Sequence, residues 1–290
     1  MIVDAHQHFW RYDPREYGWI DDRMSALKRD FLPVDLVPHL EQAGVDATIA
    51  VQTQQTLDET RWLLQLADEQ PFIAGVVGWV DLQADGVEAQ LDSVRHPRLC
   101  GIRHIVQSEP DDRFLLGAAF GRGIAALGQA GLPYDILIYP RHLPVAADFV
   151  ARFPSQPFVL DHLGKPEIRS AAIDDWARDL RRLAAAPNVC CKLSGLVTES
   201  HWRTWTPAWI EPYLDVAFEA FGPSRLLAGS DWPVCTLAAD YSRTMAVVRD
   251  YLGRFPSAER EAVLGGNAVN VYLKSQLPGL EIRGSGLGKP

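Results

Sequence analysis

The chain alternates short apolar runs with segments of helical apolar spacing, and this alternation limits the folds that it can adopt. Eight apolar runs predict strands, at residues 2–8, 47–52, 73–80, 101–106, 134–138, 158–162, 189–193 and 225–231. Continuously apolar strands are typical of a parallel sheet that is covered on both faces. Eight strands separated by helical segments predict a single-domain α/β fold, the (β/α)8 TIM barrel. A doubly wound open sheet is the alternative, but no Gly-x-Gly-x-x-Gly turn follows any of the runs.

Helical spacing predicts helices at residues 33–43, 58–70, 84–94, 114–130, 143–153, 173–185, 209–221, 241–252 and 258–273. We therefore expect one barrel over residues 1–275 and a partly disordered tail over residues 276–290. Residues 9–25 are aromatic and charged with weak periodicity, and long irregular segments in compact domains are usually functional. We interpret this segment as a loop that covers the substrate.

Composition narrows the class of protein. Of 290 residues, 47% are hydrophobic, which suffices for a large core, while the net charge of −9 argues against nucleic acid or an anionic membrane as a partner. No apolar stretch approaches the roughly 18 residues of a membrane span, and an expected strand from residue 2 leaves no room for a signal peptide. The four cysteines lack Cys-x-x-Cys spacing, which indicates reduced thiols and a cytoplasmic protein. A monomer and a homo-oligomer both stay open.

A pair of histidines closes the first apolar run. His6 and His8 are separated by one residue, and side chains at positions i and i+2 of a strand point to the same face. Two neutral imidazoles side by side suit a divalent metal of the zinc class. Taken alone, the motif is equally typical of two hydrogen-bonded polar residues at a strand end, so its meaning depends on the rest of the chain.

Other polar residues end later strands, where the chemistry of such a barrel takes place. Asp231 ends the last expected strand, although it would also suit a loop cap, and Arg103 lies among apolar neighbours, where a surface arginine is unexpected. Arg103 and His104 are adjacent, as are Asp161 and His162, so in a regular strand only one of each pair points inward. Further candidates are Glu109, Lys165, Lys192 and Ser194; Glu109 equally fits a solvated loop, and His142 equally fits a helix start.

These residues stand in longer motifs that occur in a fixed order. They are Asp4-Ala5-His6-Gln7-His8-Phe9-Trp10, Gly101-Ile102-Arg103-His104, Arg141-His142-Leu143-Pro144, Leu160-Asp161-His162-Leu163-Gly164-Lys165-Pro166, Lys192-Leu193-Ser194-Gly195, Gly229-Ser230-Asp231-Trp232-Pro233 and Gly266-Asn267-Ala268. The ordered set resembles the amidohydrolase superfamily, and within it the sugar-lactonase branch of L-fuconolactonase-like and L-rhamnonolactonase-like proteins. The resemblance runs from residue 2 to about residue 273.

The resemblance implies a catalytic site at the barrel mouth. Asp231 is expected to be the general base, with Arg103 and His162 stabilising the carbonyl oxyanion. A metal would lie near His6, His8, Glu109 and Asp231. Binuclear members of the superfamily carry a histidine on strand five, and residues 134–138 contain none. We therefore expect at most one divalent ion, with zinc favoured and a metal-free site left open.

The resemblance also implies a reaction, the hydrolysis of a sugar-acid lactone of the L-fucono- or L-galactono-lactone type to its aldonic acid. The expected substrate contacts are Trp10, His104, His142, Lys165 and Trp232, and Trp79 and Trp202 are further aromatic residues that we expect near the mouth. A dicarboxylate lactone of the pyrone or muconolactone type is an alternative, which the single arginine at the recognisable strand ends disfavours, although Arg141 and Arg203 stay open as pocket residues. Two more alternatives are a metal-dependent aromatic-acid decarboxylase and a non-catalytic carbohydrate-binding barrel.

Overall fold

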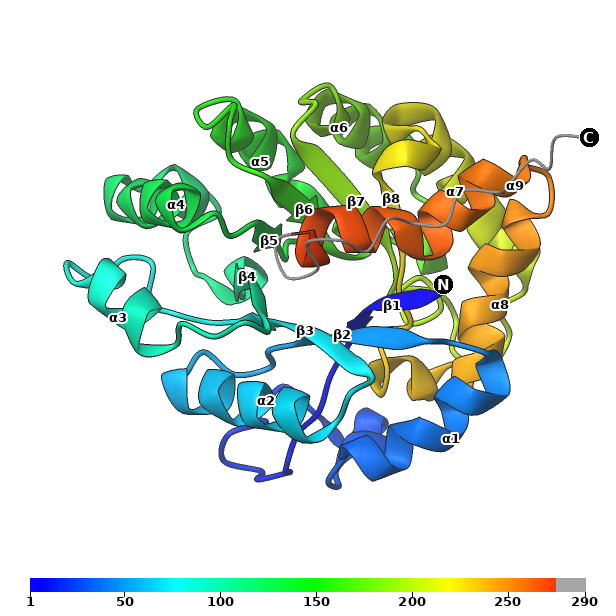
Figure 1. The fold of residues 1–290 in the computed structure, drawn as a ribbon. Helices are drawn as coiled ribbons and strands as arrows, with labels where there is room; N and C mark the ends of the chain where they lie inside the picture. The colour runs from blue at the N-terminus through cyan, green and yellow to red at the C-terminus, as the bar shows by residue number, and fades with distance from the viewer. Residues whose placement is uncertain (275–290) are drawn as a thin grey trace, which may run out of the picture.

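A computed structural model describes residues 1–274 and places one parallel sheet at the centre of the molecule. Its eight strands follow one another in chain order, so each strand pairs with the next along the sequence (Figure 1). They are β1 (Val3–Gln7), β2 (Ala47–Val51), β3 (Ile73–Gly78), β4 (Leu99–His104), β5 (Tyr134–Ile136), β6 (Phe158–Leu160), β7 (Val189–Leu193) and β8 (Leu226–Ala228). The predicted (β/α)8 barrel is confirmed.

The sheet closes on itself just beyond the ends of its first and last strands. The backbone N–H of Asp231 donates to the carbonyl of His6 at 2.8 Å, and the N–H of His8 donates to the carbonyl of Trp232 at 2.7 Å. Below these bonds the buried carboxylate of Asp4 accepts from the backbone N–H and the hydroxyl of Ser230. The closure therefore brings the ends of the first and last strands together at the point where the predicted catalytic residues lie.

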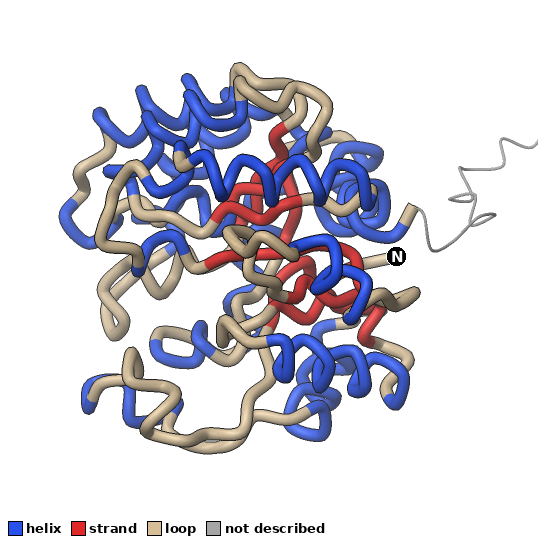
Figure 2. The backbone as a smooth tube through the Cα atoms, turned by 90° about the vertical axis from the view of Figure 1, so that its left-hand side faces the viewer, coloured by secondary structure: helices blue, strands red, loops and turns tan. Residues whose placement is uncertain are grey.

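Helices surround the barrel and supply the outer part of its core (Figure 2). They are α1 (Pro33–Ala43), α2 (Leu57–Glu69), α3 (Val87–Ser93), α4 (Ala118–Ala130), α5 (Leu143–Val150), α6 (Asp174–Ala184), α7 (Pro207–Phe221), α8 (Tyr241–Leu252) and α9 (Ser257–Glu261). The helix expected at residues 114–130 is divided, because Gly117 has an extended backbone (φ −60°, ψ 138°) between a 3-10 turn at Phe114–Leu116 and α4. Within residues 1–274, no helix is both long and apolar enough to cross a membrane.

The last described segment covers the N-terminal end of the barrel. After α9 the chain continues through two π-helical turns, Ala262–Gly266 and Val269–Leu273, which cross the strand starts and are orange to red in Figure 1. The Asn267 amide donates to the carbonyls of Pro223 and Leu226, both at 2.8 Å. This end is closed by apolar contacts, so the functional site is sought at the other end. The tail predicted at residues 276–290 lies outside the described residues.

Seven of the eight strands end one to three residues earlier than the sequence predicts, and two of these ends bear on the site. We expected strands to reach His162 and Asp231, whereas β6 stops at Leu160 and β8 at Ala228. The reason is local: His162, Leu163 and Asp231 have φ values of 54°, 54° and 57°, in the left-handed region that no strand can contain. The chain therefore turns at His162 and Asp231, two of the polar residues that the sequence predicts at strand ends.

Candidate active site

A cavity of about 960 Å³ opens at the C-terminal ends of the strands. Its walls come from several different strand–helix loops, which is where the active sites of enzymes with this architecture lie. The lining includes His8, Arg103, His162, Lys165 and Asp231 of the predicted site. Trp19, Arg23 and Met24, from the segment expected to cover the substrate, line it as well. The cavity thus joins the predicted catalytic residues to that loop.

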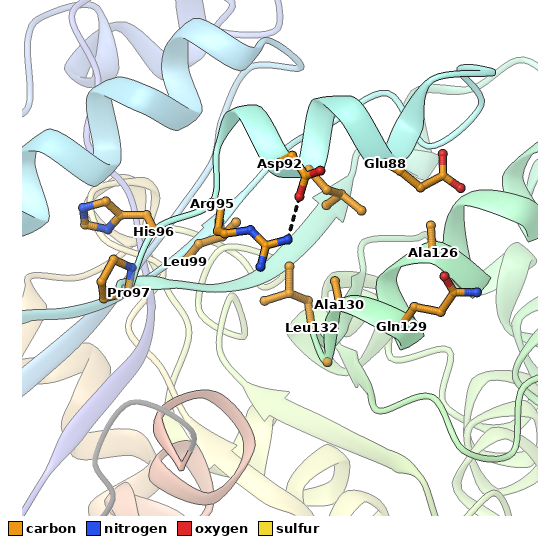
Figure 3. A pocket seen from close by; sticks show the side chains of 12 residues that line it. Glu88, Asp92, Arg95, His96, Pro97, Leu99, Ala126, Gln129, Ala130 and Leu132 are labelled. Carbon is orange, nitrogen blue, oxygen red and sulfur yellow. Dashed lines mark hydrogen bonds and ion pairs between the residues drawn. The ribbon is translucent and has the colours of Figure 1, made fainter.

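A second hollow of about 760 Å³ lies at the opposite end of the strands, between α3 and α4 (Figure 3). Its charged side chains are exposed and form surface contacts, such as the 2.6 Å pair between Arg95 and Asp92. None of the predicted site residues lines it. The chemistry of the side chains, rather than the size of the hollow, identifies the first cavity as the candidate site.

Three side chains converge where His8 and Asp231 line this cavity, and the third is the fully buried His6. The His6 and His8 Nε2 atoms lie 3.1 Å apart, and Asp231 Oδ1 lies 3.2 Å from His8 Nε2 and 3.8 Å from His6 Nε2. All three residues are buried, and they form one of the groups whose ligand atoms are close enough to hold a metal ion. The i, i+2 spacing on β1 and the barrel closure beside Asp231 together produce this geometry.

The hydrogen bond of His8 to the backbone assigns its tautomer. His8 Nδ1 lies 2.8 Å from the carbonyl oxygen of Val51, which only accepts, so the proton of His8 is on Nδ1. The His6 ring faces a donor at each nitrogen, because Arg103 Nη1 lies 3.3 Å from Nε2 and Lys192 Nζ lies 3.2 Å from Nδ1. The Nε2 atoms of both histidines and a carboxylate oxygen lie close to one another. Imidazole nitrogen and carboxylate oxygen are ligands of zinc, so this set of atoms fits a divalent cation.

Charged groups surround the far side of the His6 ring. Asp161 Oδ1 lies 3.3 Å from His6 Nδ1, and Asp161 Oδ2 accepts from Arg103 Nη1 at 2.8 Å. The Lys192 ammonium lies 3.0 Å from Asp161 Oδ1. Asp161 and His162 with His6 form a second group with the spacing of metal ligands, but two cations already neutralise Asp161. We therefore place a metal with Asp231 rather than with Asp161.

His162 lies beside the Asp231 carboxylate although Asp161 also points into the barrel. The positive φ of His162 turns the chain after Asp161, so both neighbours face the interior, which the alternation of a regular strand does not allow. His162 Nδ1 lies 2.8 Å from the Ser194 hydroxyl, and its Nε2 lies 3.9 Å from Asp231 Oδ1. A Cβ atom at Gly195 would lie 2.8 Å from His162 Nδ1, so only glycine fits under this ring.

The surroundings of Asp231, His162 and His6 shift the pKa of each side chain. Burial would raise the pKa of Asp231, but the neighbouring His162 and His8 outweigh burial and lower the pKa below its usual value. Burial lowers the pKa of His162 to about 4 and that of His6 well below its ordinary range. At neutral pH the site therefore contains an ionised Asp231 beside neutral His6 and His162.

Comparison with known proteins agrees with this geometry. A family model described as Amidohydrolase matches residues 3–273. The chain belongs to the amidohydrolase family. It is 45% identical to L-fucono-1,5-lactonase of Burkholderia multivorans, over 94% of this chain and 96% of that protein, and 40% identical to L-fucono-1,5-lactonase of Burkholderia ambifaria, over 93% and 94%. A crystal structure of a Burkholderia multivorans amidohydrolase with bound zinc has a TM-score of 0.91, 44% identity, and coverage of 94% of this chain and 99% of that chain.

Two residues predicted for the amidohydrolase site lie outside the cavity. His104 follows the inward-pointing Arg103 on β4 and therefore points outward, where its ring stacks on Phe114 with centroids 4.8 Å apart. Its Nε2 donates to Glu109 at 2.7 Å. Glu109 therefore binds His104 and does not belong to the metal-ligand group, which corrects the expectation that it lies near a metal. His104 does not line the cavity, which corrects the expectation that it contacts substrate. Trp79 is on the same outward side, since its indole N–H donates to His104 at 3.4 Å.

The predicted aromatic substrate contacts also need correction. Trp10 and Trp232 are almost completely buried, and both pack against Phe31, with ring centroids 5.2 and 5.4 Å away. They support the segment after β1 instead of facing the cavity. His142 is buried at the start of α5, where its Nε2 lies 2.9 Å from Asp112. It is therefore a helix-start residue and not a substrate contact. Trp19 and Trp202 line the cavity in their place.

Sequence reasoning missed several polar residues of the cavity wall. Thr53, Arg169 and Glu199 line the cavity, and so does Arg203, for which the sequence leaves the position open. They lie in loops of low periodicity, where no pattern of neighbours distinguishes a pocket residue from a solvated one. Arg23, Arg169 and Arg203 come from loops and add cations to the mouth, so the single arginine at the strand ends, Arg103, underestimates the positive charge of the cavity wall. Some of these cations are already engaged: Arg23 pairs with Asp21, and Arg169 donates to the Ser200 carbonyl.

Proposed function

We propose that this amidohydrolase hydrolyses a sugar-acid lactone of the L-fucono-1,5-lactone type to the aldonic acid. The observation that carries the proposal is the convergence of His6, His8 and Asp231 beside Arg103, in a chain that is 45% identical to an L-fucono-1,5-lactonase over 94% of its length. The fold alone would not support a substrate, because barrels of this kind host many reactions.

Asp231 is the proposed general base. Its carboxylate is ionised at neutral pH and faces the cavity, so it can accept a proton from a water molecule that attacks the lactone carbonyl. The proton then passes from Asp231 to the ring oxygen as the ester bond breaks. Because that transfer restores the carboxylate, the residue ends the cycle in its starting state.

Arg103 and His162 are proposed to stabilise the negative charge that develops on the carbonyl oxygen. Both line the cavity next to Asp231, and a preorganised donor of this kind is typically worth about 10²–10³ in rate. The Arg103 guanidinium is held by Asp161 and by the carbonyl of Gln52, so it is oriented before the substrate arrives. Lys165 is the further predicted contact that lines the cavity.

His6, His8 and Asp231 would hold one divalent ion, and we propose zinc. A divalent ion at these atoms supplies positive charge that makes water more acidic and a carbonyl more electrophilic. Glu109 is not part of this proposal, because His104 binds it. The role of the chain is to hold both Nε2 atoms and the carboxylate oxygen close to one point.

The proposal includes a small-molecule substrate as the partner of this site and a cytoplasmic setting. Three of the four cysteines, Cys100, Cys191 and Cys235, are buried as free thiols, as expected for a protein of a reducing compartment.

A pH-indicator assay with a panel of lactones tests the proposal. Purified protein is mixed with L-fucono-, L-galactono- and L-rhamnono-lactones in weak buffer, and acid release is followed against the spontaneous rate. We expect rapid acid release from at least one L-sugar lactone. Carbon dioxide release from an aromatic acid, without lactone hydrolysis, would instead identify the decarboxylase alternative.

A further inference from the structure

A buried carboxylate on α2 binds the loop that follows β2. Glu59 is buried and does not line the cavity. Thr56 caps the first turn of α2, where its hydroxyl oxygen accepts from the Glu59 N–H at 3.1 Å. In a capping box, the carboxylate at this position returns to the N–H of the cap residue. The Glu59 carboxylate reaches further back, to Thr53 and Gln54, so it holds a loop as well as a helix end.

Three donors share the two oxygens of the Glu59 carboxylate. The Thr53 N–H lies 3.0 and 3.1 Å from them, and the Gln54 N–H donates to Oε2 at 2.7 Å. The third donor is the Thr53 hydroxyl, which donates to Oε1. A buried polar group needs such partners, and here every donor comes from two adjacent loop residues. Glu59 therefore fixes both the backbone and one side chain of this loop.

The segment that covers the cavity, the covering loop, consists of residues 11–30. Its base is closed by Trp10 and Phe31, whose backbones exchange two hydrogen bonds of 2.9 Å. Three of its residues line the cavity: Trp19, Arg23 and Met24. They lie well inside the loop, so their position depends on contacts beyond its base.

The two residues that Glu59 binds are also contacts of the covering loop. The Tyr17 hydroxyl lies 3.2 Å from Thr53 Oγ1, and Tyr17 is the donor, because the Thr53 hydroxyl proton is directed to Glu59. The Gln54 side-chain amide donates to Glu16 Oε2 at 3.0 Å. Two parallel paths of hydrogen bonds thus run from one buried carboxylate to adjacent residues of the covering loop.

We propose that Glu59 is a positioning residue, which holds the covering loop over the substrate cavity through Thr53 and Gln54. Water is a reactant in lactone hydrolysis, so the loop does not have to exclude it from the reacting atoms. The cavity-lining residues of the loop instead bind the substrate, and losing the Glu59 hydrogen bonds weakens that binding. The expected effect on substrate rests on the proposed function, whereas the placement of the loop does not.

Hydrogen exchange followed by mass spectrometry tests the placement of the loop without substrate. It is made at pH 8, above the pKa of about 7 to which burial raises Glu59. Glu59→Gln replaces one acceptor oxygen by a donor of similar size, and Tyr17→Phe removes only the hydroxyl and keeps the ring that packs on Trp10. The net effect of one hydrogen bond is about two- to tenfold in an opening equilibrium.

We expect peptides from residues 11–30 to exchange at least about twofold faster in both variants. Peptides from α6, on the other side of the barrel in Figure 1, should exchange as in the wild type. Unchanged exchange of the covering loop in folded Glu59→Gln overturns the proposal. If that variant does not fold, unchanged exchange of the loop in Tyr17→Phe overturns it.

Kinetics separate positioning from a general loss of structure. In both variants we expect KM for the best lactone to rise at least about threefold, with kcat within about twofold, as for lost uniform binding. A partly unfolded preparation would lower kcat and leave KM unchanged. Tyr251→Phe is the matched control, since its hydroxyl donates to Asp215 at 2.7 Å outside the cavity lining, and it should change neither constant. A wild type that hydrolyses no lactone refutes the proposed function, while hydrogen exchange still decides this inference. Unchanged KM in folded variants of an active enzyme refutes the inference alone.

The double variant Glu59→Gln, Tyr17→Phe tests whether the two residues act along one path. The Tyr17 hydroxyl depends on Thr53, which Glu59 holds, so the second substitution should add less than about twofold to the KM of Glu59→Gln. A KM that multiplies the two single effects would show that the residues act independently, and would contradict the proposal.

Discussion

At the scale of single residues, backbone conformation decides which side chains meet in the cavity. His162 and Asp231 both have positive φ, which costs about 1–2 kcal/mol for a residue with a Cβ atom. Strain of this kind persists where the surrounding structure imposes it, and it is frequent at active sites. Here it places an imidazole and a carboxylate 3.9 Å apart at the ends of two strands that are not neighbours in the sheet.

Asp231→Asn is expected to lower kcat at least about 100-fold, because the variant keeps the side-chain volume but loses the base. Near-UV circular dichroism should show an intact fold. The control is Asp92→Asn, an exposed aspartate on α3 in the hollow of Figure 3, which should retain full activity. A variant that keeps more than about a tenth of the wild-type kcat would remove Asp231 from the mechanism.

Gly195→Ala tests whether the position of the His162 ring matters. The new Cβ atom would lie 2.8 Å from His162 Nδ1, so the ring must move away from Ser194 and Asp231. We expect kcat to fall at least about tenfold in addition to a loss of stability. Gly131→Ala is the matched control: its φ of +69° is nearly that of Gly195, +70°, but no atom lies within 4 Å of the new Cβ. Equal kcat losses in both variants would show that backbone strain, not the ring, is responsible.

At the scale of elements, the sequence predicted the strands and helices better than their ends. Apolar runs determine where strands form, since the barrel buries them on both faces. The ends depend on single residues such as Gly117, which interrupts a predicted helix, and His162, whose left-handed turn no propensity indicates. The sequence pattern that predicts β4 does not tell whether Arg103 or His104 points into the barrel. In the structure Arg103 points inward, and His104 packs on Phe114 outside the barrel.

The composition of β5 supports a prediction about metal content. Its inward aspartate, Asp135, is bound by Lys192 and Tyr272 and has no free oxygen to offer a second ion. We expect elemental analysis of the purified protein to find at most one tightly bound divalent ion per chain. His8→Asn should lower that content, whereas His39→Asn, on the outer helix α1, should not. Two tightly bound ions per chain would require ligands other than those described above.

At the scale of the whole molecule, the cavity is assembled from loops that are distant in sequence. Sequence motifs identified the residues at the strand ends because strands have recognisable patterns. They could not place Trp10 and Trp232, whose aromatic side chains would suit a sugar ring as well as the packing around Phe31 that they have. Sequence motifs also could not predict how many charged residues line the cavity, because that number depends on how the loops with Arg23, Arg169 and Arg203 fold over the barrel.

The charges at the mouth bear on substrate class, for which we predict a neutral sugar lactone over a dicarboxylate. Several cations line the cavity, but Arg103 is paired with Asp161, Arg23 with Asp21, and Glu199 and Asp231 add negative charge to the same walls. A dicarboxylate would approach these two carboxylates with its own extra charge, whereas sugar hydroxyls can donate to them. Steady-state kinetics should therefore give a higher kcat/KM for an L-sugar lactone than for a pyrone dicarboxylate. Glu199→Gln should raise kcat/KM for the dicarboxylate and so reduce the ratio of kcat/KM for the sugar lactone to that for the dicarboxylate. A wild-type protein with a higher kcat/KM for the dicarboxylate would contradict the substrate class and leave only the prediction of lactone hydrolysis.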